Sequence, residues 1–207
     1  MNLSEKHGFV FLCMPKCAST SIEGTLGSYC SLNYKATAKQ KHIGLSDFKT
    51  TFPQYSQLET VCIFREPTDW VGSWYRYRSR SQNKGRPTWT GDITFDQFIE
   101  GYLSEDLPRF ANWDLPTQSD FVVNSSNDVG VDLIFDMNRI DLIAEYLSDK
   151  LNTKVSFPSR NTSPKMELEL SDHLVDPLMN KLEKDLKIYD IISTTGLATA
   201  EQINSNL

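Results

Sequence analysis

The chain has 207 residues, of which 39% are hydrophobic and 23% charged, and this globular composition excludes a disordered or fibrous protein. Its formal net charge of −6 argues against general nucleic-acid binding, which requires a basic surface. A chain of this length is expected to form one domain, spanning residues 1–207, around one hydrophobic core.

The N-terminal stretch MNLSEKHGF lacks the long apolar segment of a signal peptide, and no window of about 18 apolar residues occurs elsewhere. The four cysteines are too scattered for a disulfide scaffold or a zinc knuckle. We therefore expect a cytoplasmic protein that has no membrane partner. Cys13 and Cys62 lie in apolar runs, so they are interpreted as small buried hydrophobic residues.

Three continuous apolar runs predict strands that are buried on both faces of a parallel sheet: residues 9–13, 61–65 and 132–137. A helix signal follows each run. Hydroxyl caps precede Ile22 and Leu26 after the first, a proline-initiated helix starts near Pro67 after the second, and an apolar face spans residues 140–151 after the third. This alternation predicts an α/β fold with a central, mainly parallel sheet flanked by helices in three layers.

Two further helices are expected to pack on this frame. One begins with a Thr94 cap and places Phe95, Phe98 and Ile99 on one side. The other is a last helix over the sheet, with leucines every four residues from Leu174 to Leu186, and Pro177 must start it or kink it. We interpret their apolar residues as core.

The stretch MPKCASTS, residues 14–21, follows the first predicted strand and leads into a helix, where unpaired backbone N–H groups and the helix dipole favour an anion. Lys16 adds a full charge there. The stretch has no glycine, however, and its lysine comes early compared with the nucleoside triphosphate loop G-x-x-x-x-G-K-[ST]. Asp136 is the one strand-end acid that could serve a magnesium ion. The pattern disfavours an ATPase or kinase.

The segment VCIFREPTDWVGSWYRYRSR places Arg65 at the end of a predicted strand and Ser73 eight residues later in the following helix. Both side chains can reach one phosphate over the sheet edge, where open α/β folds bind ligands. Two anion sites on adjacent strands predict a nucleotide with two separate phosphate groups.

These two segments resemble the 5′-phosphosulfate loop and the 3′-phosphate motif of the sulfotransferases, closest in pattern to the carbohydrate and heparan types. The resemblance, which also takes in RNTSP at residues 160–164, implies a P-loop-like fold and the cofactor 3′-phosphoadenosine 5′-phosphosulfate (PAPS), with PAP as product. It implies that the cofactor contacts are Lys16, Cys17, Ala18, Ser19, Thr20, Ser21, Arg65, Ser73, Arg160 and Asn161. The chain is short for this family and has little sequence for a large acceptor-binding insertion.

Sulfuryl transfer requires charge stabilisation on the leaving oxygen and a base for the acceptor, and this scheme requires no metal. Lys16 is predicted to donate to the leaving oxygen. By the resemblance to heparan-type enzymes, His42 is the predicted base, since a histidine with a pKa near neutrality suits that role. Glu23 and Glu66 compete for it.

The stretch from Trp70 to Gly91 holds five basic residues and no acidic one. It is either a solvated helix face or a local anion site. On the second interpretation Arg76, Arg78 and Arg80 bind the acceptor, a small molecule or a glycan, possibly anionic.

Three functions stay open from the sequence. The first is a PAPS-dependent sulfotransferase that acts on a hydroxyl, most naturally of a carbohydrate. The second is a small P-loop kinase, and the third is a non-catalytic protein that binds PAP or another nucleotide and has lost its acceptor site.

Overall fold

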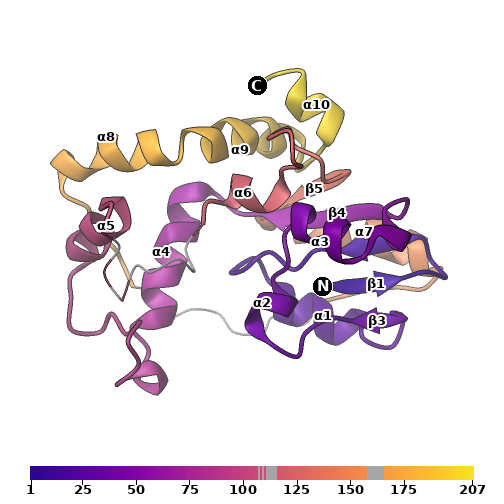
Figure 1. The fold of residues 1–207 in the computed structure, drawn as a ribbon, viewed down its shortest axis with the longest axis horizontal. Helices are drawn as coiled ribbons and strands as arrows, with labels where there is room; N and C mark the ends of the chain where they lie inside the picture. Colours follow the sequence, from indigo (N-terminus) through magenta and orange to yellow (C-terminus); the bar gives the residue numbers. More distant parts are fainter. Residues whose placement is uncertain (107, 109, 111–115, 158–165) are drawn as a thin grey trace.

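The computed structural model describes residues 1–106, 108, 110, 116–157 and 166–207, and its centre is a mixed β-sheet (Figure 1). Within these ranges the sheet has six strands in the order β3-β1-β2-β4-β5-β6. Their bounds are β1 Asn2–Ser4, β2 Phe9–Phe11, β3 Leu32–Asn33, β4 Glu59–Phe64, β5 Leu133–Asp136 and β6 Leu197–Thr199.

The three central strands β2, β4 and β5 run parallel, and they coincide with the three predicted apolar runs. The α/β prediction with a parallel centre is thereby confirmed. The edges were not predicted: β1 and β3 pair antiparallel beside β2, and β6 pairs antiparallel with β5. These three outer strands have only two or three residues each, too few for a period of two to be visible in the sequence.

The register brings the carboxyl ends of the parallel strands together at one end of the sheet, which we call the carboxyl edge. Phe11 lies opposite Val61 in the β2–β4 pair, and Phe64 lies opposite Asp136 in the β4–β5 pair. Residues that follow these strands therefore meet at the carboxyl edge, where Arg65 and the loop after β2 emerge.

Helices flank this sheet and extend beyond it. Their bounds are α1 Ser19–Leu26, α2 Ala38–Lys41, α3 Leu45–Thr51, α4 Pro67–Arg78, α5 Phe95–Leu103, α6 Gln118–Val122, α7 Ile140–Leu151, α8 Asp172–Lys181, α9 Glu183–Thr195 and α10 Ala200–Asn204, with short 3-10 turns at η1 Pro53–Tyr55, η2 Ser81–Asn83 and η4 Met137–Arg139. The predicted helices after the three central strands are confirmed. Among the described residues no helix combines the length and the apolar character needed to cross a bilayer.

The structure corrects the prediction for the C-terminal leucines. They belong to two helices, α8 and α9, which meet at Leu182. Pro177 lies inside α8 and does not mark the division. The Thr94 prediction is confirmed, because its hydroxyl caps α5 in a reciprocal capping box with Gln97.

The buried side chains of the described residues form one connected cluster around the sheet. Helices α7 and α9 pack against β5, and α9 also packs against β6. Figure 1 shows α4 projecting from the end of β4 with α5 and α8 beside it, and the α4–α5 and α5–α8 contacts hold this part together. Cys13 and Cys62 are completely buried, as their apolar surroundings predicted.

Candidate functional site

The loop between β2 and α1 has a backbone that its sequence does not suggest. Lys16 and Ala18 both adopt positive φ, at 64° and 53°, although neither is glycine. Cys17 between them is not among the residues with positive φ. Residues of alternating hand turn successive N–H groups toward one point, and such a concave nest binds anions. The missing glycines are thus replaced by left-handed residues of other types.

The backbone donors of this loop are open. Met14 donates to Leu12, and the next N–H with an acceptor is that of Ser21, which bonds the Ala18 carbonyl. In the described part of the chain, the N–H groups between them have no acceptor: Lys16, Cys17, Ala18, Ser19 and Thr20. Because α1 starts at Ser19, its dipole adds partial positive charge at the same place.

The hydroxyls of the loop are also placed for a ligand. Those of Ser19 and Ser21 make no hydrogen bond with any other described residue, and Thr20 Oγ1 accepts from Lys41 Nζ at 3.3 Å. An accepting hydroxyl keeps its own proton free to donate. Lys41 is a second cation beside the loop that the sequence did not single out.

The left-handed Ala18 makes a stability prediction. An L-residue in this region costs about 1–2 kcal/mol relative to glycine, and a glycine costs about 0.4–1 kcal/mol of extra unfolded-state entropy. Ala18→Gly should therefore raise the free energy of unfolding by about 0.5–1 kcal/mol. Urea titration measures it. A loss of stability in the variant would contradict the backbone conformation described above.

Lys16 carries an ammonium group that lies over aromatic rings. Its Nζ is 4.1 Å from the ring centre of Tyr77 and 5.8 Å from that of Trp74, both on α4. No hydrogen-bond acceptor or carboxylate contacts it within the described ranges. Burial, together with the guanidinium groups of Arg80 and Arg65, lowers the pKa of Lys16 to about 8. The group is a cation held among other cations, an arrangement that an anion would stabilise.

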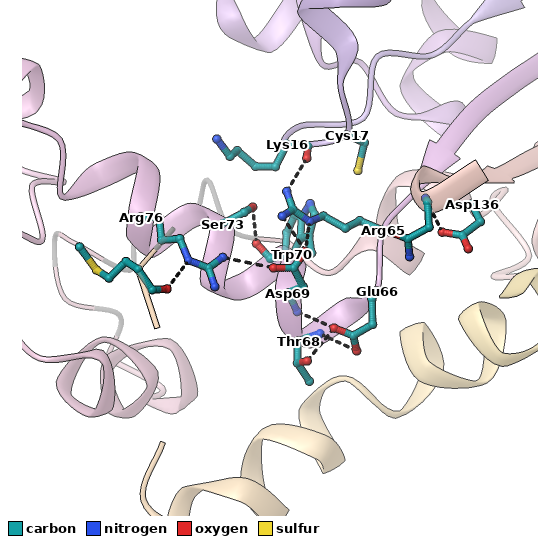
Figure 2. A network of polar contacts seen from close by, with 12 residues as sticks. Lys16, Cys17, Arg65, Glu66, Thr68, Asp69, Trp70, Ser73, Arg76 and Asp136 are labelled. Carbon is teal, nitrogen blue, oxygen red and sulfur yellow. Dashed lines mark hydrogen bonds and ion pairs between the residues drawn. The ribbon is translucent and has the colours of Figure 1, made fainter. Parts of the chain in front are cut away.

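Arg65, at the end of β4, links the loop to α4 (Figure 2). Its Nη1 donates to the Lys16 carbonyl at 3.1 Å, and its Nε donates to Asp69 Oδ2 at 2.6 Å. Asp69 also receives Arg76 Nη1 at 3.2 Å, so one carboxylate bridges two guanidinium groups. Since a guanidinium has five N–H donors, Arg65 retains donors for a phosphate.

A helix cap and one hydrogen bond to the loop fix the start of α4. The Glu66 carboxylate accepts the N–H groups of Thr68 and Asp69, which caps the helix, and the ring of Pro67 begins it. Trp70 Nε1 donates to the Pro15 carbonyl at 2.9 Å. Trp70 therefore anchors the loop to α4. The sequence reasoning missed this role, because a tryptophan in such a helix is normally interpreted only as a core residue.

Ser73 does not present its hydroxyl in this structure. The residue is fully buried, and its Oγ donates to the Trp70 carbonyl at 2.6 Å, within the helix. The backbone of Ser73 is near the network of Arg65 and Asp69 (Figure 2), but its hydroxyl would have to change rotamer to donate to a phosphate. The prediction that Ser73 binds a phosphate stays a prediction.

The three arginines predicted to bind the acceptor have different surroundings. Arg76 donates to the Met166 carbonyl and to Asp69. Arg78 is 3% exposed, and it donates to the Phe110 carbonyl and lies over the Trp74 ring. Arg80 lies over the Tyr77 ring at 5.4 Å, on the ring that also holds Lys16. Unlike the other two, the Arg80 side chain donates no hydrogen bond to any other described residue.

His42 lies beside the beginning of the loop. Its Nδ1 bonds the Cys13 carbonyl, and because a carbonyl only accepts, Nδ1 carries the proton and Nε2 carries the lone pair. No described residue contacts Nε2 with a hydrogen bond. Burial lowers the pKa of His42 below its usual value, which keeps the ring neutral at pH 7. A neutral imidazole with an open Nε2 is suited to accept a proton.

Glu23 and Glu66, the two carboxylates that could serve as the base in place of His42, both have other partners. Glu23 pairs with Lys41 at 2.8 Å and Lys35 at 3.1 Å. Burial alone would raise the pKa of Glu23, but the hydrogen bonds from Lys41 and Lys35 outweigh it and hold that pKa below its usual value. Glu66 is occupied as the cap of α4. This geometry favours His42 over either carboxylate as a base.

The other candidate residues are Cys17, Asp136, Arg160 and Asn161. Cys17 is buried, and burial raises the pKa of its thiol to about 12, so only its backbone is suited to a ligand. Asp136 accepts from the Asn138 N–H as the cap of η4. Arg160 and Asn161 lie outside the described residues. The residue that the sequence reasoning missed most clearly is Gln118, whose amide contacts both Cys17 and Arg65.

A surface hollow of about 470 Å³ lies along α7 and is lined by Ala144, Glu145, Ser148, Asp149, Lys154 and Val155. It is remote from the loop, because α7 runs back from the carboxyl edge and its Lys150 pairs with Glu59 at the start of β4. None of the predicted site residues lines this hollow.

Comparison with known proteins returns no relative. No family model matches the chain, and no curated protein and no solved structure is significantly similar to it. The resemblance to sulfotransferases therefore rests on the residues of the two sequence segments alone.

Proposed function

We propose that this protein is a PAPS-dependent sulfotransferase with a three-layer, P-loop-like fold, which transfers a sulfuryl group to a hydroxyl of a carbohydrate. One observation carries the proposal. The ammonium of Lys16 has no acceptor in the described part of the chain, and it extends from a loop whose N–H groups from Lys16 to Thr20 are equally unpaired. Such a loop at a helix N-terminus suits the doubly charged 5′ end of the cofactor.

A second anion position supports a nucleotide with two phosphates. Arg65 stands at the end of the neighbouring parallel strand, hydrogen-bonded to the carbonyl of Lys16 itself. The 5′ group would lie on the loop, and the 3′-phosphate would lie against Arg65, with Ser73 joining after a rotamer change. Asp69 keeps the guanidinium oriented by its short contact with Nε.

The residues of the chain divide the chemistry between them. When bound, PAPS supplies the sulfuryl group and a phosphate as leaving group. Lys16 donates a hydrogen bond to the leaving oxygen and stabilises its growing charge. His42 accepts the proton of the acceptor hydroxyl at Nε2, while its Nδ1–H stays bonded to the Cys13 carbonyl and fixes the tautomer.

Arg80, which lies over the Tyr77 ring, is followed in the chain by the exposed Lys84 and Arg86, and this local excess of positive charge supports an acceptor that carries negative charge. All four cysteines are free thiols, which supports the cytoplasm as the compartment. The net charge of −6 supports neither DNA nor RNA as a partner.

Calorimetric titration distinguishes the proposal from its alternatives. We expect PAP to bind without magnesium and more tightly than AMP or ATP with magnesium. Sulfate release in the presence of mixed glycan and phenol acceptors should then follow. Tight binding of ATP that depends on magnesium would favour a kinase, and PAP binding without any turnover would favour a non-catalytic nucleotide-binding protein.

The lowered pKa of Lys16 predicts how PAP affinity depends on pH. An anion beside the ammonium stabilises its charged form, so the pKa of Lys16 must rise on binding from about 8, and binding takes up a proton above that pH. Affinity should thus fall as pH rises through about 8, by up to tenfold per pH unit, while the phosphates stay ionised. Titrations between pH 7 and about pH 9.5 measure this dependence.

Lys16→Arg is the control for that measurement, because a guanidinium stays charged across the whole range. The variant should bind PAP with a flat pH profile. A flat profile in the unchanged protein would show that Lys16 does not face the bound anion.

A further inference from the structure

Gln118, in the first turn of α6, is fully buried and contacts both anion-binding segments. Its Oε1 accepts the N–H of Arg65 at 3.0 Å and the thiol of Cys17 at 3.6 Å. Its Nε2 donates to the Arg65 carbonyl at 2.9 Å. One amide therefore bonds both backbone groups of Arg65 in the way a neighbouring strand would, and it also reaches the loop.

Gln118 joins the two segments at a point beyond the last main-chain hydrogen bond between β2 and β4. The main-chain pairing of β2 with β4 ends at the bond from Leu12 N–H to the Val61 carbonyl. Beyond it, the loop and the end of β4 diverge, and side chains must set their separation. Trp70 and the Arg65 guanidinium do so through carbonyls of the loop, while Gln118 does so through the backbone of Arg65 and the thiol of Cys17.

Asp185 on α9 in turn holds Gln118. Its two carboxylate oxygens accept the N–H groups of Gln118 and Ser119, each at 2.8 Å, and the residue is fully buried. Burial raises the pKa of Asp185, and these N–H bonds oppose that effect. Since α9 packs on the sheet, the position of the Gln118 amide is tied to the core of the fold.

We propose that Gln118 is a positioning residue that sets the separation between the loop and Arg65, and so makes the site selective for nucleotides with phosphates at both the 5′ and 3′ positions. This inference rests on the proposed function. Two linked groups bind better than one only if both sites are occupied at once, and a shift of about 1 Å between the sites removes much of that gain. Loss of the amide would also leave the half-buried N–H and carbonyl of Arg65 without the partners they have in this structure, which favours such a shift.

The test compares three ligands on Gln118→Leu: PAP, AMP and adenosine 3′-monophosphate. We expect PAP affinity to fall about tenfold to hundredfold, and the affinities of the two monophosphates to stay within about twofold. Gln118→Asn, whose amide is withdrawn by one methylene, should show the same selective loss and replaces the leucine variant if that does not fold. Thermal unfolding of each variant is measured alongside.

Gln202→Leu is the matched control, because the Gln202 side chain accepts the Thr199 N–H in α10, away from the loop. It should leave all three affinities unchanged. A parallel loss for all three ligands in the Gln118 variants, or no loss, would overturn the inference. If the unchanged protein binds PAP no more tightly than AMP, the proposed function fails, and this inference fails with it.

Discussion

Replacing Lys16 with alanine should lower the rate of sulfate transfer by about 10²–10³ while PAP still binds, because one donor to the developing charge of a leaving oxygen contributes that much. The open backbone N–H groups of the loop do not depend on the side chain, so they would continue to hold the 5′ end. Single-turnover rates and PAP titrations, made on the same preparation, measure the two quantities separately.

Lys181→Ala is the matched control for this variant. Its ammonium also lies over an aromatic ring, that of Tyr102 at 4.7 Å, but it belongs to α8. The control should keep full transfer activity. If Lys16→Ala stays folded and transfers sulfate at the normal rate, Lys16 has no part in the chemistry.

Replacing His42 with alanine should lower turnover by about 10²–10⁴, the usual contribution of a positioned general base, with PAP affinity unchanged. A base must be neutral to act, and burial lowers the pKa of His42 below 6.5. Activity of the unchanged protein should therefore persist down to pH values below 6.5 and fall as the ring becomes protonated. The pH profile of turnover at saturating PAPS measures this fall in activity at low pH.

His7→Ala controls for the loss of an imidazole. His7 Nδ1 also bonds a backbone carbonyl, that of Lys150 at 2.9 Å, but it precedes β2 at the opposite edge of the sheet. Its variant should keep normal turnover. If His42→Ala and His7→Ala behave alike, the base must be sought among other groups near the loop.

Much of the frame was predictable because it is encoded locally. The apolar runs of β2, β4 and β5 are buried on both faces, which leaves a continuous hydrophobic signal. The cap at Thr94 is a pattern of four residues. The outer strands β1, β3 and β6 were not predicted, because two or three residues show no period, and the pairings of β3 and β6 depend on partners distant in the chain.

The residues of the candidate site could be predicted from the sequence, but the contacts between them could not. Lys16 and Arg65 were selected because the segments that follow adjacent parallel strands meet at one end of the sheet, and His42 was selected by the resemblance to heparan-type enzymes. The surroundings of the arginines were not predictable: Arg78 is buried against Trp74 and the Phe110 carbonyl, while Arg80 is half-buried and lies over the Tyr77 ring. Which of these arginines is buried depends on the segments that pack against the end of α4.

The sequence by itself determined the three central parallel strands and the helices that follow them, the position of the loop after the first central strand, and the basic residues near it, since these follow from hydrophobic period and residue type. Only the tertiary structure decided the left-handed backbone at Lys16 and Ala18, the burial of the Ser73 hydroxyl, and the hydrogen bonds between the Gln118 amide and the backbone of Arg65. These features depend on contacts between segments far apart in the chain, as between Gln118 and Asp185, and on the packing that makes a strained or buried conformation the best one available.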